Sequence, residues 1–584
     1  MISDKLKLLH LRTHVAEDKA VLAEDTAGHD LYTDDVAYRR MQTLEYSERE
    51  TETLQFNGEH TLPFPSVGVP GVVTFLEPEV DWTVAKSSST LNTPDKRTFA
   101  ATWSDGTPGE LTYIPGIGWF QLPDIPPQYS ADVNTEGVEN FERIFKDIRE
   151  ESDQYFLNGK LPFEQWTGGK GYLKVGYFND DVERSFDQDN YAPLFTSNTE
   201  TFPADWDEFW SDFYDREIFE SPYGAAYEAE QNISAWYWMV DMPLSSFFKV
   251  VGGTRYEKTT LEIEFEADED TVWYDRETGL GTSLRDDPPN DAGFDNKDVL
   301  PVLGFEFTPL KDKLVFRANY SQTIARPTFK EISPVATQDY AGGDLFVGNP
   351  ELKMSSLENY DLRADWTPYQ GALVSLSWFR KKIKDPIEYT QDNVSFFGDF
   401  TTAANYPEGE LSGYEVEVRQ HIGQFVDSFD GLSVGGNLTL IDSEVTLPES
   451  EVQYYIDGGY GFVERTRDMT GAPEYLYNLF TTYDIERTGT KLGLFYTVTG
   501  DTLVAGPKSR GEYVQGVYAL EYGTLNFSLS QKLGDHWTLA FKARNLLNPE
   551  IQEVYRSDYI EEGDVLKKSY TKGMEFSVSL GCEF

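Results

Sequence analysis

Carboxylates and aromatic rings are concentrated in one segment of the chain, between residues 180 and 220. Oxygen-rich loops bind calcium, and rings flanked by carboxylates stack on sugars while the carboxylates accept hydrogen bonds from sugar hydroxyls. The candidate ligand-binding residues are Trp206, Phe209, Trp210, Tyr214, Asp205, Asp207 and Asp212. The alternative is an acidic, solvated loop with a small aromatic core, which we favour because no spacing matches a defined calcium loop. We expect no cofactor other than calcium in such acidic loops.

Other motifs indicate neither catalysis nor redox chemistry. Residues 431–435 read GLSVG and match the G-x-S-x-G nucleophile elbow, which needs a sharp turn from a strand into a helix. Here the motif begins an alternating strand with no helix after it, so we predict that the protein is not an enzyme. The single cysteine, Cys582, excludes an internal disulfide, and the 6 histidines are too scattered to suggest a metal site.

The charge balance is strongly acidic and argues against a nucleic-acid partner. Lys and Arg number 49 against 100 Asp and Glu, which gives a net charge of -51. Phosphate recognition needs clustered basic residues, which this composition does not favour. Aromatic residues make up 15% of the chain, too many for a disordered acidic polymer, so the sequence predicts a folded protein.

Strict alternation of apolar and polar residues dominates the chain from about residue 229 onward. The clearest case is the last segment, in which every second residue is apolar: Met574, Phe576, Val578, Leu580, Cys582 and Phe584. A period of two predicts a β-strand with one apolar and one polar face. Helical spacing is nearly absent, so we predict an all-β protein.

Short and long connections alternate between these segments. This alternation predicts an antiparallel up-and-down β-barrel of the outer-membrane kind. Short polar turns, such as 242–245 and 308–311, would lie at the periplasmic end. We assign residues 46–584 to the barrel and residues 1–45 to a residual strand end and loop. Large extracellular loops are expected near 91–146, 181–228, 266–298, 326–355, 386–411, 445–473, 501–518 and 558–571.

The polar faces of the predicted strands carry charges in mid-strand, which favours a water-filled lumen over the outer face of a soluble sandwich. Arg363 and Asp365 share one such face, and Arg317 lies on another. Aromatic residues near strand ends, such as Trp366 and Trp537, fit an interfacial girdle. We therefore expect the apolar faces to contact outer-membrane lipid.

Three motifs give the chain a resemblance to TonB-dependent outer-membrane receptors, which is strong over about residues 229–584. They read YSQTIARPTFKEISP at 320–334, GNPELK at 348–353 and ARNLLNPE at 543–550. The residues that match these motifs are Arg326, Pro327, Asn349, Pro350, Asn545 and Asn548. The resemblance implies a plugged transporter barrel with loops that bind substrate.

Local physical chemistry suggests structural roles for several of these residues. Pro327 cannot donate a hydrogen bond to the sheet, so it should end the preceding strand. Arg326 either anchors the following loop to an acidic neighbour or faces the lumen, and we favour a structural role. Asn545 and Asn548 are expected to shape a strand bend. Phe584, at the end of the last strand, is the expected contact with the barrel assembly machinery.

Family members resembling this chain carry a signal peptide, a TonB-contact box and a plug ahead of the barrel, and none is recognisable here. Counting alternating segments gives roughly seventeen strands, against about twenty-two for a plugged transporter. The sequence therefore predicts a barrel truncated at its N-terminus. Contact with the TonB complex is expected only through the missing region.

The resemblance implies TonB-energised uptake of a scarce small molecule or oligosaccharide across the outer membrane. We lean toward an oligosaccharide, since an anionic ferric siderophore would be repelled by loops as acidic as 205–220. A siderophore or cobalamin receptor of the same family is the first alternative. A passive porin-like channel and a secreted carbohydrate-binding β-protein are alternatives from other classes.

Overall fold

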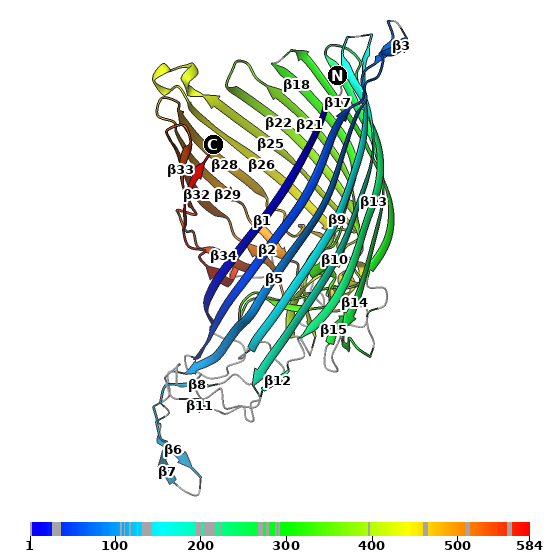
Figure 1. Ribbon diagram of the computed structural model, residues 1–584. Coiled ribbons are helices and arrows are strands. Elements are labelled where there is room, and N and C mark those ends of the chain that lie inside the picture. The colour runs from blue at the N-terminus through cyan, green and yellow to red at the C-terminus, as the bar shows by residue number, and fades with distance from the viewer. Residues whose placement is uncertain are drawn as a thin grey trace.

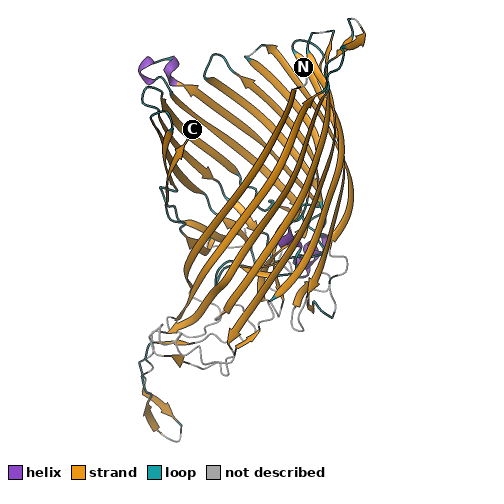
Figure 2. Cartoon of the chain, in the orientation of Figure 1, coloured by secondary structure: helices purple, strands orange, loops and turns teal. Residues whose placement is uncertain are grey.

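The structure of the chain is a computed structural model dominated by one large antiparallel sheet. It describes residues 3–25, 37–69, 71–104, 108–109, 111–115, 118–124, 126–130, 142–166, 168–193, 201–202, 218–220, 224–266, 272–275, 280–286, 289, 293–311, 313–394, 398–458, 465–508, 514–556 and 563–583. The sheet has 24 strands and curls into a barrel-shaped wall (Figure 1). Helical segments are few and short in the described part of the chain (Figure 2).

The long strands of this sheet pair antiparallel in chain order, as the sequence predicted. They are β1 (Ser3–Asp25), β2 (Ala37–Thr61), β5 (Glu79–Ser104), β9 (Glu142–Gln165), β10 (Lys170–Pro193), β13 (Ala225–Pro243), β14 (Phe248–Glu266), β17 (Gly293–Leu310), β18 (Leu314–Ala325), β21 (Ser355–Trp366), β22 (Ala372–Lys384), β25 (Glu408–His421), β26 (Leu432–Thr446), β28 (Tyr475–Ile485), β29 (Thr490–Thr499), β32 (Tyr522–Leu533), β33 (Trp537–Arg544) and β36 (Glu575–Cys582). Each pairs with the next, and no pairing between β1 and β36 occurs among the described residues. This order is that of an up-and-down barrel.

Shorter elements join or cap the long strands. Short members of the large sheet are β3 (Val67–Val69), β4 (Val73–Phe75), β8 (Gln128–Ser130), β11 (Thr201–Phe202), β12 (Ile218–Glu220) and β27 (Thr466–Arg467). Two hairpins are formed by β6 (Leu111–Ile114) with β7 (Gly118–Gln121) and by β15 (Val272–Asp275) with β16 (Leu280–Ser283). The helical segments are α2 (Phe329–Ile332), α3 (Glu449–Asp457), η2 (Ile422–Gln424) and η3 (Asp427–Phe429). Within the described residues, no helix has the length and apolar composition needed to cross a bilayer.

The predicted alternation places apolar side chains on the outer face and polar ones on the inner face of the wall. On β21, Leu362 and Trp366 are exposed on the outside, whereas Arg363 and Asp365 face inward. The last strand repeats the pattern, with Phe576, Val578 and Leu580 exposed on one face. An apolar outer band and a polar interior are the arrangement of a membrane barrel, in which lipid covers the outside.

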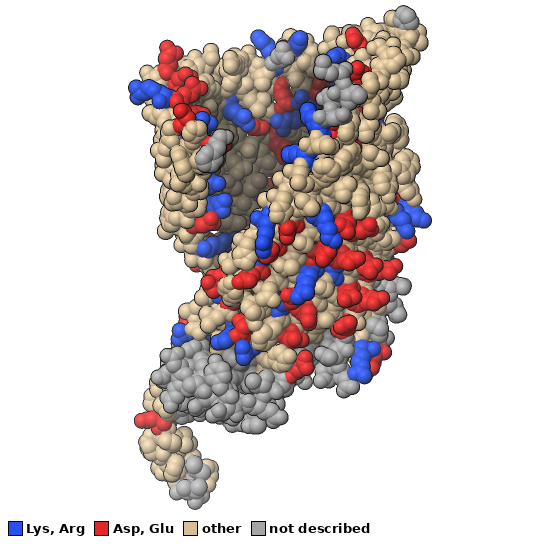
Figure 3. All heavy atoms as spheres, viewed as in Figure 1, with Lys and Arg blue, Asp and Glu red and all other residues tan. Residues whose placement is uncertain are grey.

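The N-terminal half of the wall is much taller than the C-terminal half. Strands β1, β2, β5, β9 and β10, which we call the tall wall, have 23 to 26 residues, whereas β36 has 8. At about 3.3 Å per residue a strand of this length far exceeds an apolar band about 25 Å tall. Accordingly, the outer face is apolar near one end of these strands and densely charged beyond it (Figure 3).

This height corrects three predicted boundaries. Residues 1–45 are not a strand remnant, because β1 and the first part of β2 pair along most of them. The loops expected from 91 and 181 begin later, because β5 and β10 continue to Ser104 and Pro193. In these regions the outer face carries charged side chains, so both faces of the strand are polar and hydrophobic alternation no longer marks it.

Segments from four of the predicted loop regions form two small sheets of their own. One consists of β19 (Ala336–Gln338), β20 (Leu345–Val347), β24 (Gly398–Asn405) and β23 (Ile387–Val394), and the other of β30 (Thr502–Ala505), β31 (Gly516–Ala519), β34 (Ile551–Arg556) and β35 (Val565–Tyr570). A buried cluster that includes Phe186, Tyr227, Ile332 and Val335 joins the wall to the loop between β18 and β21. Burying such side chains contributes about 1.5–3 kcal/mol each. The hydrophobic core therefore lies at the loop end of the barrel.

Candidate functional site

The loop at residues 326–354, which we call the strap, folds inward from β18 and lies against the inner face of the wall. Its first residue, Arg326, forms an ion pair with Glu257 of β14 and a hydrogen bond to the Thr259 hydroxyl, with Nη2 3.2 Å from Oγ1. Glu257 also accepts a hydrogen bond from Arg255, with Nε 2.6 Å from Oε2. The structure thus places Arg326 beside a buried carboxylate at the base of the strap.

Local sequence signals explain how the strap begins. Strand β18 ends at Ala325, two residues before Pro327. Thr328 and Glu331 then form a capping box, in which the threonine side chain accepts from the Glu331 amide and the glutamate side chain accepts from the Thr328 amide. This motif starts the short helix α2, whose Ile332 is completely buried against the wall.

The GNP motif holds the far end of the strap. A side chain at Gly348 would overlap the Ser333 carbonyl, so the close approach of these two segments requires glycine. Asn349 donates from its amide to the Ala403 carbonyl of β24 at 3.0 Å and accepts from the Glu351 amide at 3.0 Å. Pro350 beside it is buried. Asn349 and Pro350 therefore lie in a packed turn of the strap.

Hydrogen bonds from three donor groups hold the tip of the strap against the tall wall. Lys96 of β5 donates to the carbonyls of Gln338 and Asp339, with Nζ–O distances of 2.7 and 3.1 Å. Lys19 of β1 donates to the Asp339 carbonyl at 3.2 Å, across 320 residues of sequence. The Ala341 amide donates to Thr43 Oγ1 of β2 at 2.8 Å.

The other side of the strap tip is held by β35. Asp344 lies between two lysines, with Oδ1 2.5 Å from Lys567 Nζ and Oδ2 3.3 Å from Lys568 Nζ. Burial by itself raises the pKa of Asp344, but the two ammonium groups outweigh it and lower that pKa. Gly342 has a φ of 80° and lies against the Met41 side chain, so this turn needs glycine for both conformation and space.

Between the strap and the inner wall lies a pocket of about 260 Å³. Its charged lining residues are Lys19, Lys96, Lys146, Arg184, Lys330, Glu45 and Asp339. Cations therefore outnumber carboxylates in this pocket, although the chain has a net charge of -51. The local charge is opposite in sign to that of the protein as a whole.

Burial shapes the electrostatics of the pocket. Lys96 is 5% exposed, and burial lowers its pKa to about 8 against the opposing effect of Glu45, whose carboxylate lies 3.8 Å away. Burial also lowers the pKa of Lys146 on β9. Both residues lie toward the loop end of the wall, beyond the apolar outer band. Arg184 is already paired, with Nη1 2.7 Å from Glu150 Oε2 and its guanidinium over the Phe329 ring.

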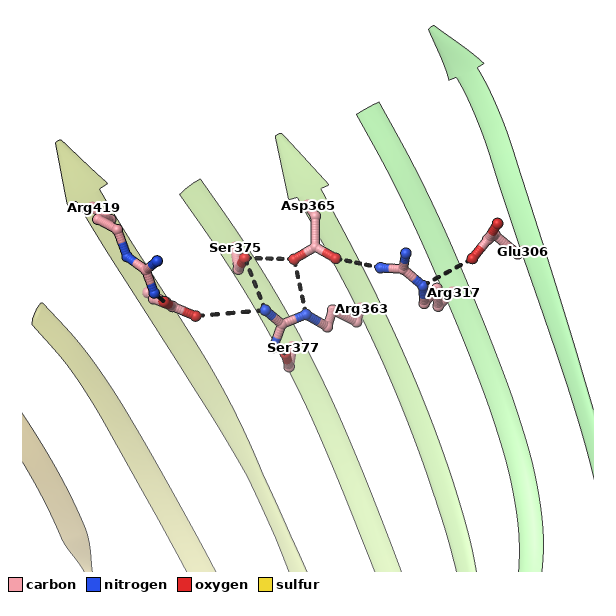
Figure 4. A network of polar contacts seen from close by, with 8 residues as sticks. Glu306, Arg317, Arg363, Asp365, Ser375, Ser377 and Arg419 are labelled. Atoms are coloured by element: carbon pink, nitrogen blue, oxygen red, sulfur yellow. Dashed lines mark hydrogen bonds and ion pairs between the residues drawn. The ribbon is translucent and has the colours of Figure 1, made fainter. Parts of the chain in front are cut away.

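A second polar array crosses the inner wall on strands β17, β18, β21, β22 and β25 (Figure 4). Arg317 Nη1 lies 2.5 Å from Asp365 Oδ2, and Arg363 Nε lies 2.8 Å from Asp365 Oδ1. The array extends to Glu306 on one side and, through Glu417, to Arg419 on the other. Its cations and carboxylates alternate and neutralise one another, so the array leaves no charge of its own free for a ligand.

The ligand-binding residues expected from the sequence cannot be placed. Trp206, Phe209, Trp210, Tyr214, Asp205, Asp207 and Asp212 lie outside the described residues, as does Phe584. In the described part of the chain, no group of three or more His, Cys, Asp or Glu side chains is arranged to hold a metal ion. Calcium in the acidic segment therefore stays a prediction.

Asn545 and Asn548 shape the connection between β33 and β36. Both have positive φ angles, 54° and 41°. Asn545 donates from its side-chain amide to the Gly573 carbonyl at 2.7 Å, and Asn548 Oδ1 accepts from the Gly573 amide at 2.8 Å. Asparagine tolerates the left-handed region better than most residues, and its short amide satisfies nearby backbone groups.

A family model agrees with the barrel architecture. A model of the family "TonB dependent receptor-like, beta-barrel" matches residues 22–546. No curated protein sequence matches the chain. The ferric yersiniabactin uptake receptor of Yersinia pestis is similar at 13% identity and a TM-score of 0.47, over 99% of this chain and 76% of that one. The ferric-catecholate import receptor of Escherichia coli K12 is similar at 11% identity and a TM-score of 0.46, over 99% and 80% of the two chains.

Proposed function

Because the chain belongs to the family of TonB-dependent receptors, we propose that it is an outer-membrane transport receptor whose ligand binds between the strap and the tall wall. Members of this family are outer-membrane transport receptors rather than enzymes, and they bind small-molecule ligands and TonB. The outer-membrane location of this chain, its contact with lipid and the role of its last strand in assembly belong to the same proposal.

The observation that carries the proposal is the partly enclosed pocket on the inner face of the wall. Wall strands and the strap form it together, and its volume of about 260 Å³ is just below the usual range for small-molecule sites, about 300–1,000 Å³, so it suits one group of a ligand. The strap is fixed at its base by Arg326 and at its tip by Lys96 and Asp344. A pocket lined by a rigid wall and a separately anchored loop can admit a ligand when the loop moves.

The ligand class has two candidates. An oligosaccharide is supported by the aromatic and acidic composition of residues 205–214. A siderophore or cobalamin is the alternative within the family, and the cationic lining of the pocket removes the electrostatic objection to an anionic siderophore at this site. Calcium, if it takes part, would act in the acidic segment and not in the cationic pocket.

Uptake by cells that produce the receptor tests the proposal. The probes are fluorescently labelled oligosaccharides and siderophores loaded with radioactive iron, each offered to cells with and without TonB. We expect the protein in the outer-membrane fraction and accumulation of one probe class only with TonB. Accumulation without TonB would indicate a passive channel instead. Recovery of the protein from the culture medium would indicate a secreted β-protein.

A further inference from the structure

We propose that the pocket between the strap and the tall wall binds an oxyanion group of the ligand, a carboxylate, sulfate or phosphate. The inference rests on the proposed function in one respect: it takes this pocket to be the place where the transported ligand binds. It specifies which ligands the site accepts: those that present a negatively charged oxygen group. The geometry points to this chemistry through an unpaired cation, unpaired polar atoms and a local excess of positive charge.

The unpaired cation is Lys146 of β9. Within the described residues, its ammonium group has no hydrogen-bond or ion-pair partner, and Glu45 and Asp339 act on it only at a distance. Ile144 and Ile148 flank it on the same face of the strand and line the same pocket. An ammonium group in a partly apolar pocket is strongly stabilised by a partner of opposite charge, because it has already lost part of its hydration.

Polar side-chain atoms without hydrogen-bond partners line the same pocket as this cation. Thr93 Oγ1, Asn190 Oδ1, Ser333 Oγ and Thr337 Oγ1 are buried and have no hydrogen-bond partner in the protein. Thr93, Asn190 and Ser333 are exposed by only 1%, 2% and 2%, and all of these residues line the pocket. Buried polar atoms are normally paired, so a group of unpaired ones in one pocket marks a place where a ligand supplies the partner.

The available groups suit an oxyanion better than a neutral ligand. The hydroxyls of Thr93, Ser333 and Thr337 can each donate a hydrogen bond, and an ammonium group only donates. Hydrogen bonds from such donors to an ionised oxygen are roughly twice as strong as those to a neutral one. Lys330 adds a further cation at the pocket edge, where its Nζ lies 5.0 Å from the centroid of the Phe346 ring.

The acidic surface of the protein does not oppose this binding. Exposed charges farther away than the Debye length, about 8 Å at physiological ionic strength, are largely screened, whereas buried charges are screened much less. The lysines line the pocket itself, so they lie much closer to a group bound there than the acidic outer surface does. The local charge of the pocket therefore decides which group binds, and the net charge of -51 does not.

Acidic oligosaccharides and anionic iron chelates both carry such a group, and matched pairs of probes distinguish these two kinds of ligand. Trigalacturonate, which bears carboxylates, is compared with neutral maltotriose, and ferric citrate is compared with neutral ferrichrome. Binding to the purified full-length receptor in detergent is measured by titration calorimetry. We expect one anionic probe to bind at least ten-fold more tightly than its neutral counterpart, and salt to weaken that binding.

Variants locate the binding in the pocket. Lys146→Gln should weaken binding of the anionic probe about thirty-fold, the usual scale for removing one partner of a buried charge pair, while Lys146→Arg should restore most of it. Ser333→Ala should weaken it to a smaller extent. Lys86→Gln is the matched control, because Lys86 lies on β5 but pairs with Glu151 on the outer face. Heat modifiability in gel electrophoresis confirms that each variant is folded.

The outcomes separate this inference from the proposed function. If Lys146→Gln binds the anionic probe as tightly as the natural protein, or if none of the anionic probes binds, the inference is wrong. TonB-dependent uptake of a neutral ligand alone would contradict the inference and support the proposed function. Lysine-dependent anion binding without TonB-dependent uptake would support the inference and contradict the proposed function.

Discussion

Lys96 and Gln338 are 242 residues apart in the sequence, yet the Lys96 ammonium donates to the Gln338 carbonyl at 2.7 Å. This contact joins a strand of the tall wall to the tip of the strap and closes one side of the pocket. The lysine is almost completely buried and also donates to the Asp339 carbonyl, which accepts a second hydrogen bond from Lys19. Lys96 is therefore one of several contacts that fix the position of the strap.

Replacing Lys96 should loosen the strap. Lys96→Met removes both hydrogen bonds to the strap carbonyls, and Asp339 keeps only its bond from Lys19. Loss of the donor to the Gln338 carbonyl should cost about 1–3 kcal/mol. Hydrogen–deuterium exchange should then increase at residues 336–345, while exchange in the paired parts of β1 and β2 should stay unchanged. Lys86→Met, on the outer face of the same strand, serves as the control. Unchanged protection of the strap in Lys96→Met would show that this contact is not needed to hold it.

Anion binding in the pocket should weaken as the pH rises above about 8. The groups that face Lys96 are Glu45 of β2, Lys146 of β9, Lys19 of β1 and Asp339 of the strap, and burial sets its pKa at about 8. Because burial lowers the pKa of Lys96, its charged form decreases the free energy of unfolding. This decrease is complete below pH 8 and disappears as the pH rises toward 10.5, the pKa of the lysine in the unfolded chain. Binding of an anion changes in the opposite direction, because it needs the charged form.

The measurement is the affinity for the anionic probe between pH 6 and pH 10 at constant ionic strength. Above the pKa, loss of one proton weakens binding by up to about ten-fold per pH unit. In Lys96→Gln the decline should be shallower, with the remaining slope due to Lys146, whose pKa is also lowered by burial. An equally steep decline in the variant would exclude Lys96 as the titrating group.

Glu257 should be essential for the base of the strap. Its side chain is 6% exposed and pairs with both Arg326 and Arg255. Glu257→Ala leaves two partly buried guanidinium groups without their carboxylate, which should cost about 3 kcal/mol in the free energy of unfolding. Urea unfolding followed by heat modifiability measures the loss. Glu262→Ala, at an exposed position of the same strand, should change stability little, and equal losses in the two variants would contradict the assigned role.

The two asparagines after β33 allow backbone conformation to be separated from hydrogen bonding. Asn548→Gly keeps the positive φ but loses the contact with the Gly573 amide, whereas Asn548→Ala loses both. A non-glycine residue in the left-handed region costs about 1–2 kcal/mol, so stability should fall in the order Asn, Gly, Ala. Barrel unfolding in urea gives this order directly. Alanine as stable as glycine would show that φ is not the limiting factor.

The fold class followed from the sequence because strand periodicity is a local property. Phe576, Val578 and Leu580 alternate with polar residues whatever the rest of the chain does, and the structure confirms their shared exposed face. The tall wall was underestimated for the same reason. Beyond the apolar band, β5 carries polar side chains on both faces, so only its pairing with β2 and β9 identifies it as a strand.

The candidate site depended on contacts that sequence could not reveal. Thr328 and Glu331 indicate the start of helix α2, and Gly348 and Asn349 indicate the packed turn of the strap, because capping and the need for glycine are local properties. Neither signal predicts that the strap folds back onto β1 and β5. The acidic composition did not indicate a cationic pocket, because composition averages over a surface whose charges are separated in space.

By itself, the sequence determined the alternating strands, their antiparallel order and the family, because each depends on residues close together in the chain. The tertiary structure alone decided that Lys19, Lys96, Lys146 and Lys330 line one pocket. These lysines lie on β1, β5, β9 and the strap, and only the curvature of the sheet and the inward fold of the strap bring them together. An isolated lysine in the sequence is an ordinary surface residue, whereas several around one partly enclosed space create a site for a negative charge.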